Sequence, residues 1–399
     1  MRTKVKLKGG ISLIVLVITI IVMIILAAAI ILSLSNSGII GKANKAKTDT
    51  DISNAKDLVA MAHADWMLDE AKIKENDNTI TSFSNYAEKK LQEAGYKVGA
   101  GEGAYTVTED GEVYTGLTET ARAGITAGIK IGDEVKYNAV LTEKSYTTDG
   151  SERTSTGAAD STKTKTVKTN TGYTWKYIGL GEDGSLLIAP DMTGTIGDDY
   201  KLTLGNKGGY INGPKMLNTV CDALYTVEGK GKAQSMNIEL VNKLLEYNGP
   251  KGTYYDTNDK AVETAEAMII AELETKFNCK ITRDYVPEGK DLGEYKADIY
   301  YINKTKHASR ITKDTVKQDL VYQANTYWLA SPCVEAWIGL KDAGFLVRCV
   351  SSTYVGTHGM FSSKGGFDPV DTYAVRPYVS LISNVQKTTE NGKTVWILS

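Results

Sequence analysis

The sequence predicts an α+β fold, with a long helix at the N-terminus and a larger β-rich part with helices behind it. The first observation is an uncharged apolar run over residues 11–33, followed by apolar residues at helical spacing. The second is a series of short runs rich in Val, Ile, Tyr and Trp beyond residue 127, separated by glycine-containing turns. At 399 residues the chain is long for one hydrophobic core, so we expect more than one compact unit.

The overall composition is that of a folded protein without a strong charge. Apolar residues make up 42% of the chain and charged residues 24%, which excludes wholesale disorder. The 46 basic and 48 acidic residues give a net charge of -2. Because such a chain has no electrostatic attraction for a polyanion, we expect no nucleic-acid partner.

Residues 1–10 form a basic leader, and residues 11–33 form a predicted transmembrane helix. At about 1.5 Å per residue, this uncharged segment spans roughly 34 Å, enough to cross a hydrocarbon core of about 30 Å. A secretory signal peptide has a shorter apolar stretch. The alternative, a buried helix of a large soluble protein, requires apolar neighbours on every side. Because flanking Lys and Arg stay cytoplasmic, we expect a single pass through the lipid bilayer, with the N-terminus inside and the rest extracellular.

The junction between the leader and the membrane segment resembles a type IV prepilin leader. Lys8, Gly9 and Gly10 are followed by ISLIVL, starting at Ile11. The resemblance implies that a membrane prepilin peptidase cleaves after Gly10 and methylates the new amine of Ile11. It also implies other pilin-like subunits as partners.

One position departs from this pattern. Major pilins carry a glutamate at the fifth mature position, where this chain has Val15. A carboxylate inside a bilayer is costly and is kept for function, so its absence suggests a subunit that is not recruited through that carboxylate. In lacking the glutamate, the chain resembles the large minor or tip subunits of the pilin family. A plain signal-anchored protein of the cell envelope remains the alternative interpretation.

The pattern over residues 34–72 predicts an amphipathic continuation of the helix. Apolar residues follow one another there at spacings of three and four, at Ala55, Val59, Ala62 and Trp66. Residues 73–126 predict a small pilin-like region with a helix over 83–94 and a hairpin around Asp110-Gly111. We expect the boundary of this region near residue 126.

Residues 127–384 predict a larger β-rich surface domain, and residues 385–399 a terminal strand or tail. Residues 145–172 are rich in Thr, Ser and Lys, so we expect a long exposed loop there. Residues 179–184 match G-x-G-x-x-G, but they lie between two strand-like runs and carry Glu182 and Asp183, which would repel phosphates. This pattern favours a hairpin turn over a nucleotide site.

Helices are predicted over residues 209–225, 235–245 and 264–277, with Asn237 as an N-cap. The second half resembles a domain of surface proteins in Gram-positive anaerobes, through its GDEVKY start, its WKYIG and YWLAS strands, the first of these helices and its closing AVRPYVSL run. The resemblance covers about residues 129–384 and implies an architecture more than an activity. The closing pattern also resembles C-type-lectin-like and formylglycine-enzyme-like folds.

Six residues of the second half are the candidates for a structural or binding role. Trp328 and Arg376 are interpreted as a buried structural pair, with the guanidinium stacking on a ring or capping carbonyls. Aromatic residues on glycine-rich loops are typical of recognition surfaces. We therefore expect an extracellular glycan or protein to bind a surface formed by Trp337, Tyr354, Phe361 and Phe367.

The 4 cysteines have no C-x-x-C spacing, so we expect no metal site. Cys333 and Cys349 are the candidates for a disulfide, because the domain is expected outside the cell. No H-E-x-x-H, G-x-S-x-G or P-loop motif is present, and we expect neither a cofactor nor an enzyme. An extracellular hydrolase with two dispersed carboxylates stays open as an alternative.

The sequence therefore predicts a pilin-like, membrane-anchored surface protein, as a minor or tip subunit of a type IV pilus-like or secretion filament. In this interpretation, the domain that it displays serves adhesion.

Overall fold

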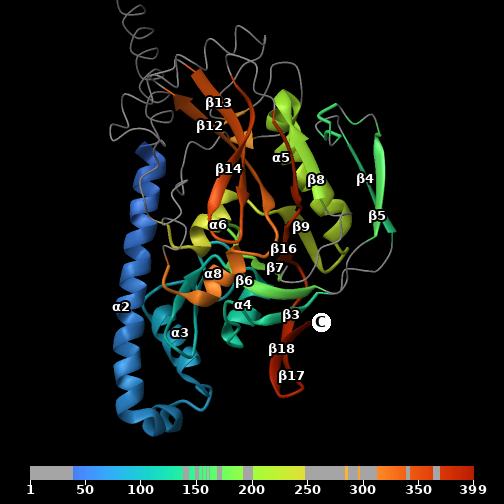
Figure 1. Ribbon diagram of the computed structural model, residues 1–399. Helices are drawn as coiled ribbons and strands as arrows, with labels where there is room; N and C mark the ends of the chain where they lie inside the picture. The colour runs from blue at the N-terminus through green and yellow to red at the C-terminus, as the bar shows by residue number, and fades with distance from the viewer. Residues whose placement is uncertain are drawn as a thin grey trace, which may run out of the picture. The chain divides into compact units, whose positions relative to one another are not determined.

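The computed structural model describes residues 39–137, 143–148, 152–154, 156–158, 160, 162–168, 173–191, 201–247, 284–285, 295–296, 312–337, 342–362 and 369–399. The fold is α+β, with a long helix followed by a β-rich region that contains several mixed sheets and helices (Figure 1). The chain divides into two compact units. The smaller unit comprises residues 1–98 and 107–113, and the larger unit comprises residues 99–106 and 114–399.

The smaller unit contains helices α2 (Ile39–Asn76) and α3 (Phe83–Glu93). As the periodicity predicts, Ala55, Val59, Ala62 and Trp66 of α2 are all buried. The Trp66 ring packs at 6.2 Å from Phe83 and 5.9 Å from Tyr86 of α3, measured between ring centroids. An amphipathic stripe on one helix and three aromatic rings therefore form the core of this unit.

Local capping sets the bounds of α3. The Ser82 hydroxyl accepts a hydrogen bond from the Asn85 amide, and Gly95 follows the helix with φ +90°. The Glu109 carboxylate also accepts hydrogen bonds from the Phe83 and Ser84 amides. The predicted hairpin is present as β1 (Tyr105–Val107) and β2 (Val113–Thr115).

The predicted leader 1–10 and membrane helix 11–33 lie outside the described residues. Among the helices that the structure describes, none combines the length and the apolar composition needed to cross a membrane.

The larger unit contains a seven-stranded sheet in the order β17-β18-β3-β6-β7-β16-β9. The predicted hairpin across residues 179–184 is confirmed, because β6 and β7 pair antiparallel with Leu180 opposite Leu186. The C-terminal segment, predicted as a strand or tail, forms β17 and β18 within this sheet, and β18 pairs parallel with β3. The strands are β3 (Glu134–Lys136), β6 (Thr174–Leu180), β7 (Leu186–Asp191), β9 (Gly231–Ser235), β16 (Pro377–Leu381), β17 (Val385–Glu390) and β18 (Lys393–Leu398).

A five-stranded sheet in the order β14-β13-β12-β15-β8 forms the other large layer of this unit. Strands β12, β13 and β14 are consecutive antiparallel neighbours, whereas β15 pairs parallel with β12 through Tyr327 and Ala374. The strands are β8 (Lys201–Gly205), β12 (Tyr327–Trp337), β13 (Asp342–Val350), β14 (Val355–Ser362) and β15 (Val370–Ala374).

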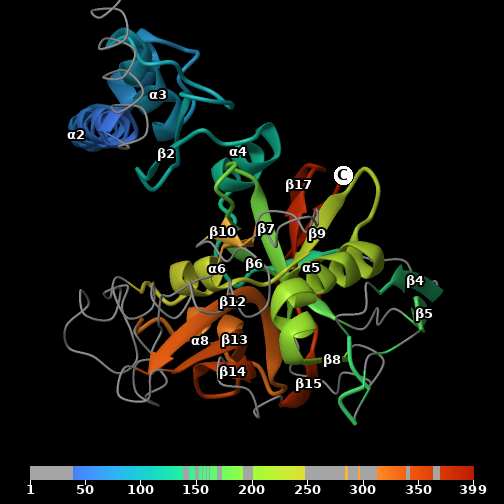
Figure 2. The same cartoon turned by 90° about the horizontal axis from the view of Figure 1, so that it is seen from above.

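Helix α5 (Asn206–Tyr225) contacts strands of both sheets, and Figure 2 shows it beside them. Its residues Met216, Leu217, Val220 and Leu224 are buried in the main core, which confirms the predicted helix there. Helix α6 (Ile238–Leu244) is capped by the Asn237 side chain, as predicted, and α8 (Thr315–Val321) is capped by Asp314. The helix predicted over 264–277 lies outside the described residues.

The loop expected over residues 145–172 is wrong in part. Strands β4 (Glu143–Thr147) and β5 (Thr164–Lys168) pair antiparallel, with Tyr146 opposite Lys165. Tyr146 and Val167 are buried, so two apolar side chains and the β-propensity of threonine are enough to form a hairpin in a polar stretch. A further two-stranded sheet pairs β10 (Asp284–Tyr285) with β11 (Tyr295–Lys296).

The boundary expected near residue 126 lies earlier, because helix α4 (Glu119–Thr126) belongs to the larger unit. Ala121 and Ile125 of α4 join the main core. A Cβ atom at Gly124 would lie 2.9 Å from side-chain carbons of both Leu186 and Val385. This close contact with β7 and β17 explains why α4 joins the larger unit, and the short sequence pattern before it does not show that contact.

Candidate ligand-binding site

Of the four aromatic residues predicted as one ligand surface, the described backbone places Tyr354 apart from Phe361 and Trp337. Tyr354 is 36% exposed, in the turn between β13 and β14. The backbone of Phe361 lies opposite Phe345, five residues along β13 from the Val350–Val355 rung, which corresponds to about 17 Å. Trp337 ends β12 beyond that point. The side chains of Trp337 and Phe361, and all of Phe367, lie outside the described residues.

The proposed disulfide is not formed. Cys349 is a buried free thiol, and burial raises the pKa of this thiol to about 12. In the β12–β13 ladder, Cys349 lies opposite Trp328, whereas Cys333 lies opposite Leu346. Three residues of strand correspond to roughly 10 Å, more than the approximately 7 Å that two bridged Cα atoms can span. The register therefore separates the two cysteines.

Trp328 and Arg376 are both fully buried, but each has its own partners. The Trp328 indole donates a hydrogen bond to the Leu202 carbonyl at 2.9 Å. Arg376 lies between β15 and β16, where the chain passes from one sheet to the other, and its guanidinium stacks over the Tyr327 ring at 5.0 Å. It donates to the carbonyls of Pro190 and Val321 and to the Tyr327 hydroxyl. Arg376 thus joins β7, α8 and β12.

A half-buried histidine lies beside Trp328. The His358 ring on β14 is 6.2 Å from the Trp328 ring and 5.8 Å from the Tyr373 ring, between centroids. Its Nε2 contacts the Asp371 carboxylate, and its Nδ1 is buried without a hydrogen-bond partner among the described residues. Burial lowers the pKa of His358, against the opposing effect of Asp371. A neutral ring that donates from Nε2 fits this arrangement, because protonated Nδ1 would be an unpaired buried donor.

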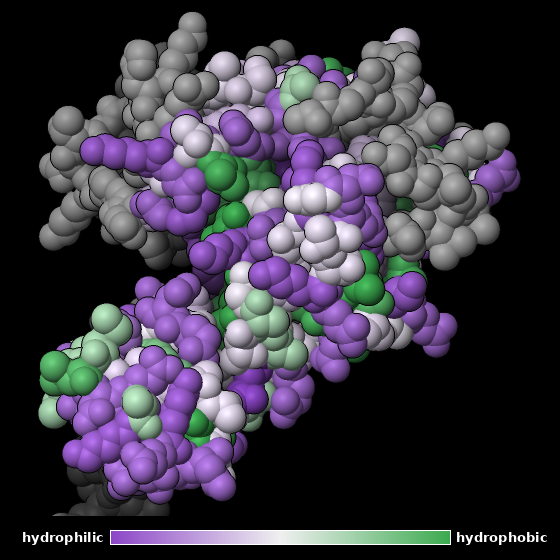
Figure 3. All heavy atoms as spheres, turned by 90° about the horizontal axis from the view of Figure 1, so that it is seen from below, coloured by the Kyte–Doolittle hydropathy of each residue, from purple (hydrophilic) through white to green (hydrophobic). Residues whose placement is uncertain are grey.

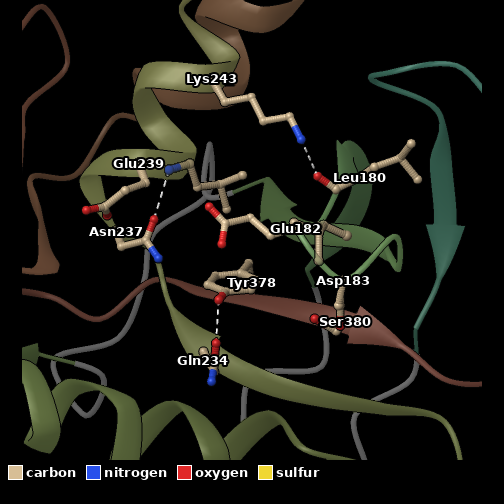
Figure 4. Close-up of a pocket in the computed structure, with 12 residues that line it drawn as sticks. Leu180, Glu182, Asp183, Gln234, Asn237, Glu239, Lys243, Tyr378 and Ser380 are labelled. Carbon is tan, nitrogen blue, oxygen red and sulfur yellow. Dashed lines mark hydrogen bonds between the residues drawn. The ribbon is translucent and has the colours of Figure 1, made fainter. Parts of the chain in front are cut away.

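One cavity of about 540 Å³ opens at the edge of the seven-stranded sheet, within the size range of small-ligand sites (Figure 4). It is formed by the β6–β7 turn, strands β7, β9 and β16, and helix α6. The residues that line it are Leu180, Gly181, Glu182, Asp183, Leu187, Gln234, Asn237, Glu239, Leu240, Lys243, Tyr378 and Ser380.

The conformation of the β6–β7 turn depends on hydrogen bonds to an aspartate and on glycines at closely packed positions. The Asp183 carboxylate accepts hydrogen bonds from the Ser185 amide at 3.1 Å and the Ser185 hydroxyl at 2.6 Å. A Cβ atom at Gly181 would lie 2.5 Å from Asp183 Oδ1. Gly184 has φ +73° and would place a Cβ 2.1 Å from the Gly116 carbonyl oxygen. The turn is therefore fixed, with Glu182 directed into the cavity above Tyr378 (Figure 4).

The opposite wall is helix α6. The Asn237 carboxamide oxygen caps the helix by accepting from the Leu240 amide at 2.9 Å, which fixes the side chain at the rim. Lys243 extends across the cavity and donates to the Leu180 carbonyl at 2.6 Å (Figure 4). This bond connects α6 to the end of β6.

The floor is the Tyr378 side chain on β16, whose hydroxyl donates to the Gln234 carboxamide oxygen on neighbouring β9 (Figure 4). Burial, followed by the nearby charge of Asp183, raises the pKa of Tyr378 to about 12. The charges of Glu239 and Glu182 also raise the pKa of Tyr378. The hydroxyl is therefore neutral at physiological pH and faces a negative potential.

The cavity combines three carboxylates, one ammonium, two carboxamides and an aromatic ring with the apolar side chains of three leucines. Such a surface suits a ligand rich in hydrogen-bond donors and excludes a polyanion. Among the described residues, no group of three or more His, Cys, Asp or Glu is positioned to hold a metal ion.

Comparison with protein-family models, curated proteins and solved structures finds no match for this chain.

The sequence reasoning missed this cavity. The run over residues 179–184 predicts a hairpin turn, and in that pattern Glu182 and Asp183 indicate only repulsion of phosphate. Tyr378 belongs to the AVRPYVSL run, whose alternation indicates that Tyr378 and Ser380 share one face of β16. That alternation was the available signal. Neither pattern indicates that α6 closes the same space.

Proposed function

We propose that this chain is a membrane-anchored, pilin-like surface protein, a minor or tip subunit of a type IV pilus-like or secretion filament. Its leader stays in the cytoplasm, residues 11–33 lie in the bilayer, and both compact units are extracellular. A prepilin peptidase cleaves after Gly10 and methylates Ile11. The larger unit binds a glycan or a protein outside the cell.

The observation that carries this proposal is the apolar character of α2 on more than one face. Trp66 and its stripe are buried in the smaller unit, whereas Met61, Met67 and Leu68 are 66%, 74% and 85% exposed. On the face shown in Figure 3, hydrophilic residues predominate and hydrophobic residues form separate patches. Exposed apolar side chains on a helix that follows a membrane segment support packing against the helices of neighbouring subunits.

The cavity supports the binding role of the larger unit. Its carboxylates accept hydrogen bonds from sugar hydroxyls or from the cationic side chains of a protein, and its tyrosine ring offers a stacking face. It lies on a rigid sheet edge, so a ligand binds to a preformed surface. We therefore prefer this cavity, whose lining residues are described, to the predicted aromatic surface as the ligand site.

The mature N-terminus tests the filament assignment. Mass spectrometry of the full-length protein, purified from membranes of a host that carries a prepilin peptidase, is expected to show a first residue Ile11 with a methylated amine. Gly10→Val is expected to retain the leader, because a side chain at the cleavage position blocks access to the backbone. Gly9→Ala is the matched control and should still be cleaved. An intact Met1 in the unsubstituted protein contradicts the proposal and favours a plain signal anchor.

A glycan array and a peptide array test the binding role. The detergent-solubilised protein is expected to retain a subset of neutral glycans or basic peptides, and Glu182→Gln should weaken retention about 10-fold or more by removing a charged acceptor. Glu228→Gln is the control, because it removes the same charge from an exposed turn of the same unit. Equal retention by both variants contradicts the assignment of the ligand to the cavity.

A further inference from the structure

A second cluster of charged residues lies at the β4–β5 hairpin, away from the cavity. The Lys165 ammonium on β5 is 2.7 Å from Glu152 Oε1 and 2.7 Å from Asp160 Oδ2. Glu152 is held in place by a β-bridge to Leu204 of β8. One amine therefore contacts two carboxyl groups at hydrogen-bond distance, on segments that the backbone fixes.

The burial of the three side chains is unequal. The Glu152 side chain is 6% exposed, that of Asp160 17% and that of Lys165 24%. Glu152 Oε2 is buried and has no hydrogen-bond partner among the described residues. Burial raises the pKa of Glu152, and Lys165 only partly offsets that effect. The pKa of Lys165 is also raised, because the opposing effect of burial is outweighed by its bonds to Asp160 and Glu152, and the bond to Lys165 lowers the pKa of Asp160, so the resting cluster is ionic. Glu152 is the carboxyl group whose pKa is raised, and it lies at hydrogen-bond distance from the Lys165 nitrogen, where it can exchange a proton with it.

Asp160 is oriented differently. Its Oδ1 accepts a hydrogen bond from the Thr162 amide at 2.8 Å, while Oδ2 faces the lysine nitrogen. A backbone N–H aimed at one carboxyl oxygen stabilises the negative charge that develops there when a nucleophile attacks the carbon. The amine, the carboxyl carbon and the proton acceptor thus have the relative placement that an acyl transfer requires.

We propose that Lys165 and Asp160 join in an intramolecular amide bond between Nζ and Cγ, with Glu152 as the proton carrier. Glu152 takes a proton from the Lys165 ammonium, and the neutral amine attacks Cγ of Asp160. The C–Oδ2 bond breaks, and Oδ2 leaves as water. Of the three ammonium protons, one stays on the amide nitrogen and two leave with Oδ2. No oxidant, cofactor or second substrate takes part, and Glu152 returns to its starting state.

This bond would join Asp160, in the connection between β4 and β5, to Lys165 on β5, and so close a short covalent loop in a unit whose Cys221 and Cys349 are free thiols. The inference does not depend on the filament assignment, because it concerns only neighbouring groups within the larger unit.

Peptide mapping of the full-length, detergent-solubilised protein tests the proposal. Trypsin cannot cleave after an acylated lysine, so the expected product is residues 154–163 joined to residues 164–168, lighter by one water than the two peptides together. Separate peptides 154–163 and 164–165 throughout the sample would overturn it.

Three substitutions identify the reacting groups. Lys165→Arg keeps the positive charge but forms no such amide, so the water loss should vanish. Lys163→Arg is the matched control, an exposed lysine on the same segment, and intact-mass measurement should still show the loss of one water. Glu152→Gln keeps the shape but removes the proton carrier, and should lower the cross-linked fraction at least 10-fold.

Succinimide formation at an Asp-Gly pair also releases one water, and the chain contains such pairs at Asp110, Asp149 and Asp183. That loss would persist in Lys165→Arg, which would contradict the amide as its source. Disappearance of the loss in Lys165→Arg, together with its retention in Lys163→Arg, supports the amide.

Discussion

The cores of the two compact units differ in how far apart in the chain the contacting residues are. In the smaller unit, the core is a stripe on α2 that packs on α3, and Trp66 meets Phe83 and Tyr86, which follow it closely in the chain. In the larger unit, the decisive contacts join distant segments. Trp328 bonds to Leu202, and Arg376 bonds to Pro190.

This difference explains which features a sequence pattern can reveal. A helix stripe is a periodicity of near neighbours, so it can be read along the chain. The contacts of the larger unit depend on which strands become neighbours. The smaller unit should therefore respond to the loss of one apolar side chain, and the larger unit to the loss of one long-range polar anchor.

The largest expected effect is at Arg376. Arg376→Ala leaves the carbonyls of Pro190 and Val321 and the Tyr327 hydroxyl without their donor, and opens a cavity. We expect the free energy of unfolding of the larger unit to fall by about 4 kcal/mol. Chemical denaturation followed by tryptophan fluorescence measures it. Arg376→Lys should lower the free energy of unfolding by less, because an ammonium keeps the charge. Some loss remains, since lysine lacks the planar fork that bonds to several acceptors at once. A loss below about 1 kcal/mol for Arg376→Ala contradicts the anchoring role.

A smaller effect is expected at Trp66. Trp66→Ala removes the ring between Phe83 and Tyr86, and should destabilise the smaller unit by about 3 kcal/mol. Hydrogen exchange of the α3 amides measures this unit by itself. Met67→Ala is the control, since Met67 is 74% exposed and should change stability by less than about 0.5 kcal/mol. Equal effects of the two substitutions would show that the stripe is not the core.

The smallest effect is a pH dependence in the larger unit. Burial lowers the pKa of His358 below its ordinary value of 6.5, so the unfolded chain binds the proton more readily. The contribution to stability is complete above pH 6.5 and is lost as the pH falls from there through the folded-state pKa. Denaturation midpoints at pH 7.5 and below should show this decline. His358→Gln keeps a donor for Asp371 but does not titrate, so an unchanged decline in that variant contradicts the assignment.

Several elements were predicted correctly because their signals are local. Helix α3 has a serine cap and a terminal glycine, α6 has the Asn237 cap, and the β6–β7 hairpin has glycines at both ends of its turn. In each case, the residues that stop or start the element lie within a few positions of it.

The failures share one physical cause. The boundary near residue 126 missed α4, whose partners Leu186 and Val385 lie far along the chain. The disulfide between Cys333 and Cys349 assumed a strand register that the ladder does not have. The surface expected from Trp337, Tyr354, Phe361 and Phe367 stays a prediction, although the ladder places Tyr354 apart from the backbone of Phe361. Extended strands separate such residues by more than 3 Å at each step.

For this protein, the sequence alone determined the α+β class, the helical stripe of α2, the capped helices and the positions of most hairpin turns, because each depends on interactions between residues a few positions apart. The prediction of a membrane helix over residues 11–33 also depends on composition alone. Tertiary structure decided that β15 and β16 belong to different sheets, that α6 faces the β6–β7 turn across a cavity, and that Lys165 contacts two carboxyl groups. These features depend on strand order and register, which arise from the packing of distant segments and leave no periodic trace in the chain.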